Sequence, residues 1–340
     1  MRIDRKKFLD RLSIASLGLS TRGLVEQSDC FIFDDGKIKT YSGSVMVVVK
    51  GLKGIKGAVI PDVLINLLKK IDDEQVDVSQ DQAGQLVVEG QNKKATIATE
   101  SEIRLDLSEI PSPGEWSPAV EGVMSQLRRA AQTCGLDESW GAATCVHVTK
   151  KAIEASDNFR LFRWNGKTGF KNEMFIPADA IELMVGIVPE SVSINGGWAH
   201  FKFGGTTISA RGRGIEKYPD MSKVCSVEGS DVNLPKGLEQ ISERAMITAE
   251  GDGHATRVSV DIGPGSGKIR SRSAKGSYRE KFKVEYTGPV LSFDVHPEIL
   301  VEIVEFCPKV TVGANRIKAV VDDATFIIAL RQSEVEDGQG

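Results

Sequence analysis

The sequence predicts an α+β protein built from three similar domains, each with two helices packed on layers of strands. Three observations support this: a proline-led helical segment occurs three times, three alternating strand-like segments follow each copy, and a fainter helical segment precedes each copy. The prolines of successive copies, Pro61, Pro177 and Pro297, are 116 and 120 residues apart. This spacing is far longer than a solenoid repeat, so each copy belongs to a whole domain.

The proline-led segments have the properties of a helix start followed by strands. Proline is favoured at the first helical position because it has no N–H to leave unbonded and its φ is already helical. Behind each helix, apolar and polar residues alternate with the period of a half-buried strand. The predicted helices are 60–70, 176–184 and 296–304. The predicted strands are 75–79, 85–89 and 95–99, then 191–194, 198–203 and 206–210, and finally 309–312, 316–320 and 324–329.

The front half of each domain repeats more faintly. Apolar residues recur at helical spacing in residues 8–15, 123–131 and 238–246. Strand-like hairpins follow, and the clearest joins residues 30–33 to 37–41, because its Asp-Gly supplies the positive-φ turn that a tight hairpin needs. Pro/Gly/Ser-rich or polar stretches at 111–118 and 226–235 are the expected junctions. We therefore expect domains at 1–117, 118–230 and 231–332, followed by an acidic tail at 333–340.

Composition limits the classes of protein that fit. The 340 residues are 41% hydrophobic and 26% charged, which suits a globular chain with buried cores. No apolar run reaches signal-peptide or membrane-span length, so a cytoplasmic protein is expected. The five cysteines lie far apart without a C-x-x-C pair, which favours reduced thiols over disulfides or a zinc site. The net charge of −4 argues against a nucleic-acid coat but leaves room for a basic face.

Enzyme chemistry finds little support in the motifs. The nearest approach to a phosphate loop, residues 263–269, has one residue too few between its outer glycines and Ile269 where magnesium binding needs Ser or Thr. It is better interpreted as a hairpin turn. The four histidines lack metal-ligand spacing, and no G-x-S-x-G element occurs. We predict no catalytic residue, no metal ligand and no cofactor.

Several short segments, in order along nearly the whole chain, carry a family resemblance. Residues 155–161, Ala-Ser-Asp-Asn-Phe-Arg-Leu, resemble an A-T-D-G-H-R-L segment, and Ile176-Pro177 resembles the start of the helix that follows it. Residues 218–224 resemble an F-P-D-Y…V segment, and 244–247 and 291–295 resemble landmarks of a third domain. These are motifs of the bacterial DNA polymerase III beta sliding clamps. Asn158-Phe159 departs from the Gly-His pair, and residues 327–332 depart from a Met-Pro-Met-like end, which suggests a virus or mobile-element copy or altered partner preference.

The resemblance implies a function as well as a fold. Family clamps are head-to-tail homodimers in which each chain of three clamp domains forms half of a ring, with the helices lining the hole. Such a ring encircles double-stranded DNA without reading its sequence and acts as a processivity factor, binding DNA polymerase and the clamp loader through short linear motifs. No membrane partner is implied. The alternatives are a clamp-fold adaptor that binds replication or transcription proteins without encircling DNA, and an enzyme.

The residues expected to face DNA are basic and lie on or beside predicted helices. Sequence-blind sliding needs diffuse phosphate attraction, because a base-specific contact would hold the ring at one site. The alternative for each is a solvated helix face. Helices 178–184 and 298–304 carry no basic residue, so the lining would be uneven, and the dense basic run 268–283 is expected on hairpin strands outside the hole. The DNA-facing candidates are Arg5, Lys6, Lys7, Arg11, Arg22, Lys69, Lys70, Arg128 and Arg129.

A second expected site is an apolar cleft for partner peptides, which the resemblance places between the second and third domains. A groove lined by Leu and Ile and rimmed by two arginines suits an extended peptide with hydrophobic anchors and an acidic or polar flank. The alternative is that Leu161, Ile328 and Leu330 are ordinary core residues. The residues carried over are Ser156, Arg160, Leu161, Arg244, Ala245, Ile328, Ala329 and Leu330.

Overall fold

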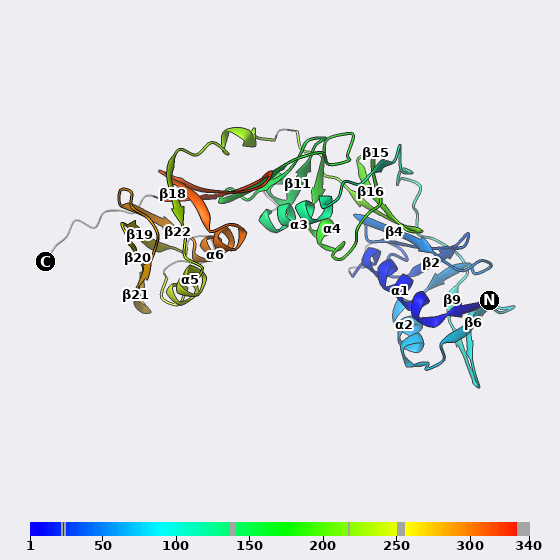
Figure 1. Cartoon of the computed structure of the whole chain (residues 1–340). Helices are drawn as coiled ribbons and strands as arrows, with labels where there is room; N and C mark the ends of the chain where they lie inside the picture. Colours follow the sequence, from blue (N-terminus) through cyan, green and yellow to red (C-terminus); the bar gives the residue numbers. More distant parts are fainter. Residues whose placement is uncertain (22, 24, 137–140, 217, 250–255, 332–340) are drawn as a thin grey trace. The chain divides into compact units, whose positions relative to one another are not determined.

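The computed structural model describes the chain apart from residues 22, 24, 137–140, 217, 250–255 and 332–340 (Figure 1). The candidate Arg22 and the acidic tail therefore lie outside the described residues. Contacts divide the chain into two compact units. Unit 1 comprises Met1–Arg128, His147–Lys150 and Thr168–Gly214, and unit 2 comprises Arg129–Val146, Lys151–Lys167 and Ile215–Gly340. Each unit is described by itself.

One order of elements occurs three times along the chain: a short strand, a helix, four strands, a second helix and three strands. The first copy, which has an additional short strand and a 3-10 turn, consists of β1 (Arg2–Asp4), α1 (Arg5–Ala15), η1 (Ser16–Gly18), β2 (Phe31–Asp34), β3 (Lys37–Tyr41), β4 (Val45–Lys50), β5 (Gly57–Val59), α2 (Pro61–Lys70), β6 (Gln75–Gln80), β7 (Leu86–Gly90), β8 (Lys93–Ile97) and β9 (Thr99–Glu100).

The later copies keep this order. The second consists of β10 (Ser117–Pro118), α3 (Val123–Thr133), η2 (Gly141–Thr144), β11 (Cys145–Val148), β12 (Ala152–Ser156), β13 (Arg160–Asn165), β14 (Met174–Pro177), α4 (Ala178–Glu182), β15 (Ser191–Asn195), β16 (Trp198–Phe203) and β17 (Thr206–Arg211), with η3 (Met221–Lys223) behind it. The third consists of β18 (Gly229–Asn233), α5 (Leu238–Met246), β19 (Val258–Gly263), β20 (Ser266–Ser273), β21 (Gly276–Lys283), β22 (Leu291–Val295), α6 (Pro297–Phe306), β23 (Lys309–Gly313), β24 (Arg316–Val321) and β25 (Ala324–Ala329). The predicted α+β class and its threefold repetition are confirmed.

Unit 1 contains two antiparallel sheets and the helices that cover them. The smaller sheet has the order β1-β6-β7-β8, and the larger has the order β10-β15-β16-β17-β4-β3-β2-β5-β9. Helix α1 packs on β3 and β4 and against α2. Its apolar positions Phe8, Leu12 and Ala15 are fully buried, one helical turn apart, so a single stripe of α1 faces the core.

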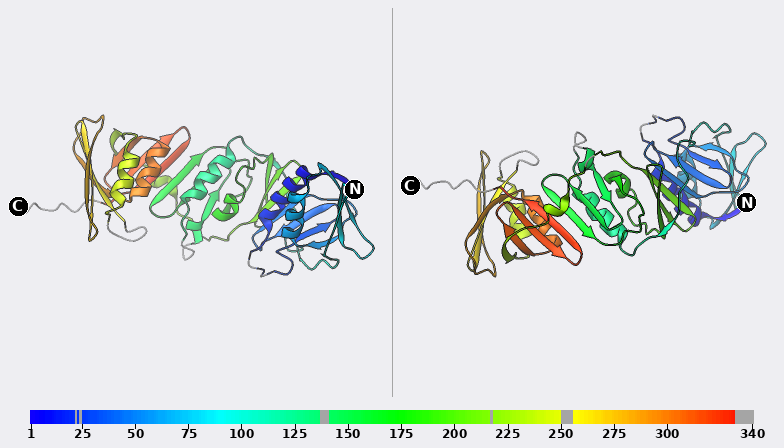
Figure 2. Two further views of the ribbon diagram at one scale, coloured as in Figure 1. Left: turned by 90° about the horizontal axis from the view of Figure 1, so that it is seen from below. Right: turned by 90° about the horizontal axis from the view of Figure 1, so that it is seen from above.

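Unit 2 is built in the same way. Strands β12-β13-β25-β24-β23-β18 are consecutive members of one sheet, and β21-β20-β19-β22 form another. Helices α5 and α6 lie side by side (Figure 2), α5 packing on β19 to β21 and α6 on β24 and β25. Phe306 of α6 contacts Phe162 of β13 and Phe326 of β25, with ring centroids 6.4 and 5.5 Å apart. These aromatic rings tie the helix to the strands beneath it.

Local predictions are mostly confirmed, and one helix differs. The Asp-Gly hairpin forms between β2 and β3, with Asp35 and Gly36 at φ 48° and 67° as its turn requires. Proline opens α2 and α6 at the first helical turn. In α4, however, Pro177 keeps an extended backbone and is the N-cap, so the helix is shorter than the predicted 176–184. Turns follow α4, and they end at Gly186, which has a φ of 80°.

Strand pairing within each unit follows one rule and leaves two strands at open ends. In unit 1, β17 pairs with β4, and in unit 2, β25 pairs with β13. In both cases the last strand of one copy pairs with the third strand after the first helix of a neighbouring copy. The second half of the second copy belongs to unit 1, whereas its first half is divided between the two units. The equivalent strands β8 and β21 are end strands of their sheets.

Candidate functional site

The basic candidates on α1 and α2 have two kinds of environment. Lys6, Lys7, Lys69 and Lys70 are exposed, the first two near the start of α1 and the others in the last turn of α2. Lysine in the last turn also complements the helix dipole, since the carbonyl end is the negative end. These four ammonium groups are therefore available to phosphates, as a diffuse DNA-facing surface requires.

Arg5 and Arg11 are already engaged within the fold. The Arg5 guanidinium donates to the main-chain oxygens of Asp73 and Leu68 at 2.8 and 2.9 Å, so it caps the carbonyl end of α2. Arg11 lies 5.5 Å from the centre of the Phe8 ring and donates to the main-chain oxygen of Lys50 at 3.2 Å. Partial burial lowers the pKa of Arg11. Both side chains therefore hold α1 against the elements beside it.

The remaining helices are less uniformly basic. On α3, Arg128 is half-buried, and the exposed Arg129 lies with its guanidinium 5.6 Å from the centre of the Phe306 ring. Helices α5 and α6 together carry five glutamates and a single arginine. Basic charge is thus unevenly distributed among the helices.

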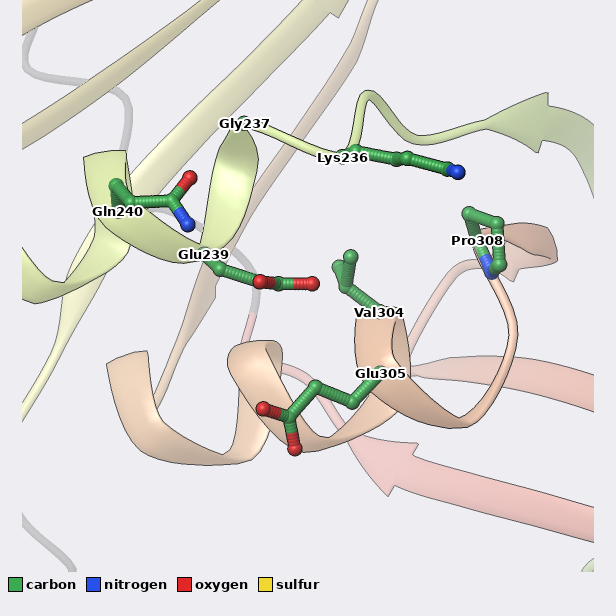
Figure 3. A pocket seen from close by; sticks show the side chains of 7 residues that line it. All are labelled: Lys236, Gly237, Glu239, Gln240, Val304, Glu305 and Pro308. Atoms are coloured by element: carbon green, nitrogen blue, oxygen red, sulfur yellow. The ribbon is translucent and has the colours of Figure 1, made fainter.

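A surface hollow illustrates the acidic character of α5 and α6. It lies between the start of α5 and the end of α6, has a volume of about 430 Å³, and is lined by Lys236, Glu239, Glu305 and Pro308 among others (Figure 3). Its charged lining consists of two carboxylates and one ammonium group, which does not favour phosphate. Nor is it the apolar cleft expected for a peptide, because it shares none of that cleft's residues.

The cleft candidates that belong to β13 and β25 lie on two faces of this strand pair. Arg160 is opposite Ile328, and Leu161 is opposite Ile327. Because neighbouring strand residues point to opposite faces, Leu161 and Ile328 face different sides. Leu161 and Ile327 are buried with Met221 under Tyr218, Val224, Cys225 and Val227. The structure therefore does not gather all eight candidates on one surface.

Most of the apolar candidates are core residues here. Ile328 and Ala245 are fully buried, Leu330 is 7% exposed, and only Ala329 among the apolar candidates is exposed. The carbonyl of Ala245 accepts a hydrogen bond from the buried Ser271 hydroxyl at 2.6 Å. Ser156 is also buried, and its hydroxyl donates to the Arg160 carbonyl at 2.7 Å. In this structure the apolar residues pack in the core, and Ser156 holds the turn between β12 and β13.

The two candidate arginines are held by different carboxylates. Arg160 donates to Asp157 at 2.8 Å and to Glu302 of α6 at 2.5 and 2.6 Å. Burial disfavours its charge, but the bonds to Glu302 and the charge of Asp157 outweigh that effect and raise the pKa of Arg160. Arg244 is exposed and forms a forked pair with Glu280 of β21 at 2.8 Å. A peptide carboxylate would have to compete with these partners for either guanidinium.

Comparisons with known proteins identify the fold. No protein-family model matches the sequence, and no curated protein sequence matches it. Solved structures do match: the beta subunit of DNA polymerase from Streptococcus pyogenes superposes with a TM-score of 0.83 over 98% of this chain and 99% of that one, at 16% identity. The chain has the fold of a bacterial DNA sliding clamp. The α+β class and family resemblance are thereby supported along the whole chain.

Other clamps agree. The Pseudomonas aeruginosa sliding clamp bound to griselimycin gives a TM-score of 0.81 at 15% identity, and the Bacillus subtilis sliding clamp gives 0.80 at 14%. Both matches cover 98% of this chain and 99% of the other. In the described part of this clamp fold, no helix is long and apolar enough to cross a membrane.

The residues that bind Arg160 and pack on Leu161 were not among the predicted site residues. Asp157 and Glu302 hold Arg160, and Met221 covers Leu161. Asp157 had a usable signal, since an Asp before a turn commonly accepts main-chain N–H groups, as it does from Phe159 and Arg160. Glu302 had none, because it lies 142 residues from Arg160 in sequence.

Proposed function

We propose that the chain is a DNA sliding clamp, a non-enzymatic ring subunit that encircles duplex DNA as a head-to-tail homodimer. In this role it tethers a DNA polymerase and other replication proteins, and a clamp loader opens it. Polymerase and loader would bind through short linear motifs. The clamp fold along the whole chain supports this class of function. The observation that carries the proposal is the pair of open end strands, β8 and β21.

These two strands are the ones that the pairing rule leaves over. When β17 pairs with β4, Ser209, the fourth residue of β17, lies opposite Met46, the second residue of β4. Strand β25 pairs with β13 in the same register, Ile327 with Leu161. The fourth residue of β8 is Thr96, and the second of β21 is Ser277. Pairing β8 of one copy with β21 of another in this register would repeat the same junction.

Two such junctions would close two chains into one ring of six repeats. The contact joins unlike surfaces, and contacts of that type form rings when the rotation closes. Binding would then be topological, so weak, sequence-blind phosphate contacts suffice. The exposed lysines of α1 and α2, with Arg128 and Arg129, are the candidates for these contacts, since α5 and α6 are acidic.

Mass and DNA retention test the proposal together. Light scattering is expected to give about twice the chain mass of 36.9 kDa. Protein assembled in the presence of DNA is expected to be retained on circular duplexes and lost from linear ones. Replacing Arg22, Arg128 and Arg129 by Ala should weaken that retention while the dimer mass stays. Equal binding to circular and linear DNA, or ATPase or nuclease activity of the pure protein, would favour an adaptor or an enzyme instead.

A further inference from the structure

The two open end strands belong to hairpins of opposite charge. Residues 258–283, which contain β19 to β21, include seven basic and two acidic residues. Residues 71–97, which contain β6 to β8, include six acidic and two basic residues. A net charge of −4 does not require basic and acidic residues to be separated in this way. The basic hairpin belongs to unit 2 and the acidic hairpin to unit 1.

The basic hairpin repels itself. Lys268 lies opposite Lys281, and Arg270 opposite Arg279, across the β20–β21 pair. Like charges directly opposite each other destabilise a sheet. Asp261 relieves the β20 members, at 3.2 Å from Lys268 and 3.0 Å from Arg270.

The outer strand β21 has no such relief. Lys281 and Lys283 are exposed, and no carboxylate of the described residues forms an ion pair with either. Strand β21 therefore presents uncompensated positive charge along an edge that is also open to strand pairing.

The acidic end is arranged in the complementary way. The loop before β6 carries Asp72, Asp73 and Glu74, and the β7–β8 turn is fastened to it by a hydrogen bond from the Gln91 N–H to Asp73 at 3.1 Å. Lys93 bridges Asp72 and Asp73, but Glu74 is exposed with no basic partner among the described side chains. A surface hollow of about 520 Å³ lies here, and its charged lining residues are Asp73, Glu74, Asp77, Glu89 and a single basic residue, Arg2. The acids thus gather at the turn end of β8.

We propose that the basic β20–β21 hairpin of one copy binds the acidic loop and hairpin of a second copy, so that opposite charges select and orient ring closure. This inference rests on the proposed clamp function and adds its recognition chemistry. In the register derived above, β21 runs past the β7–β8 turn, which brings Lys281 and Lys283 beside the loop containing Asp72 and Glu74. Lys93 then faces Glu280.

One pair in this register has like charge. Lys94 falls opposite Arg279, but it is already paired with Glu89 at 2.7 Å, so the repulsion is reduced. Joining unlike ends neutralises both hairpins, whereas joining two basic or two acidic ends would double the repulsion. The charges therefore exclude head-to-head pairing and speed encounter of the correct ends.

Charge reversal at each end tests the inference. Asp72→Lys with Glu74→Lys makes both ends positive, and Lys281→Glu with Lys283→Glu makes both negative. All four side chains are exposed, so each variant is expected to fold. Lys167→Glu with Lys223→Glu, at exposed sites elsewhere, is the control with the same charge change as the second variant.

The expected pattern is specific. Each reversed variant alone should be monomeric by light scattering, with its dimer Kd raised by about tenfold or more per reversed pair. A one-to-one mixture of the two should assemble at twice the chain mass and co-purify through a tag on one variant, because each end then meets its opposite. A chain with all four changes should again form a homodimer, and the control should remain dimeric. Recovery in the mixture also shows that both variants are folded.

Three results would overturn the inference. Reversed variants that stay dimeric show that charge does not select closure. If they stay dimeric and the Lys281/Lys283 variant instead loses binding to linear and circular DNA alike, the basic hairpin is a nucleic-acid surface. If the unaltered chain is monomeric at every concentration, the proposed clamp function fails and the inference fails with it.

Discussion

At the scale of single residues, burial changes the titration of His200 strongly. It is fully buried on β16, and its Nδ1 lies 2.8 Å from the Ser209 hydroxyl. Burial lowers its pKa from 6.5 to about 4. On acidification the unfolded chain protonates this imidazole first, so folding stability falls between these two pKa values and does not change further below the lower one.

The pH dependence of unfolding checks this. Between pH about 7 and about 5, His200 should account for a loss of about 2 kcal/mol in the free energy of unfolding. Urea midpoints of the unaltered chain should fall over this range by more than those of His200→Leu, which cannot titrate there. If the stability of the two proteins fell in parallel with pH, the pKa of His200 would be the same in the folded and unfolded chains, and burial would not lower it.

Arg160 is the residue that links the β12–β13 turn to α6. Arg160→Ala would leave the Asp157 carboxylate, which is 2% exposed, without its cation and would free Glu302. We expect a loss of about 2–3 kcal/mol in the free energy of unfolding, because breaking one side of a buried pair strands the other. Arg213→Ala, at an exposed site, should change it little. Equal urea midpoints for both variants would contradict the structural role assigned to Arg160.

At the scale of elements, neighbouring basic residues of α1 should separate stability from DNA binding. Arg5→Ala removes a hydrogen bond to the Leu68 carbonyl in the last turn of α2 and another to the Asp73 carbonyl in the loop after it, and should cost about 1–2 kcal/mol of stability. Lys6→Ala and Lys7→Ala should leave thermal stability unchanged and weaken retention on circular DNA at moderate salt. The interpretation fails if Lys6→Ala and Lys7→Ala destabilise the fold as much as Arg5→Ala.

Elements that depend on local pattern could be predicted from the sequence, and contacts between distant elements could not. The β2–β3 hairpin and helices α2 and α6 follow from turn chemistry and proline placement within a few residues. The length of α4 was wrong because Pro177 belongs to β14 as well as to the helix start. The face on which Leu161 or Ile328 lies depends on pairing between β13 and β25, which no local spacing specifies.

The same limit applies to the candidate sites. Basic residues on helices were readily found, but Arg5 was not distinguished from Lys6, because the carbonyls that Arg5 caps come from a distant part of the chain. Segregation of charge between the two hairpins is visible in the sequence as composition. Its meaning required the sheet order, which shows that both hairpins end in open strands.

At the scale of the whole molecule, the central claim is that two copies enclose DNA by pairing β8 with β21. Thr96 and Ser277 occupy the paired positions in the derived register, and both are exposed. Cysteines placed at these two sites, in a chain whose partly exposed Cys225 and Cys307 are replaced by Ser, can be joined across each junction by a short bis-maleimide.

The decisive measurement is whether that covalent ring is linked to DNA. Subunits dissociated by dilution are reassembled with circular plasmid, cross-linked, and then denatured in SDS. We expect the cross-linked protein to stay with circular plasmid after denaturation and to be released when a restriction enzyme cuts the plasmid once. Release from the uncut circle, or failure of the two cysteines to cross-link between copies, would contradict it.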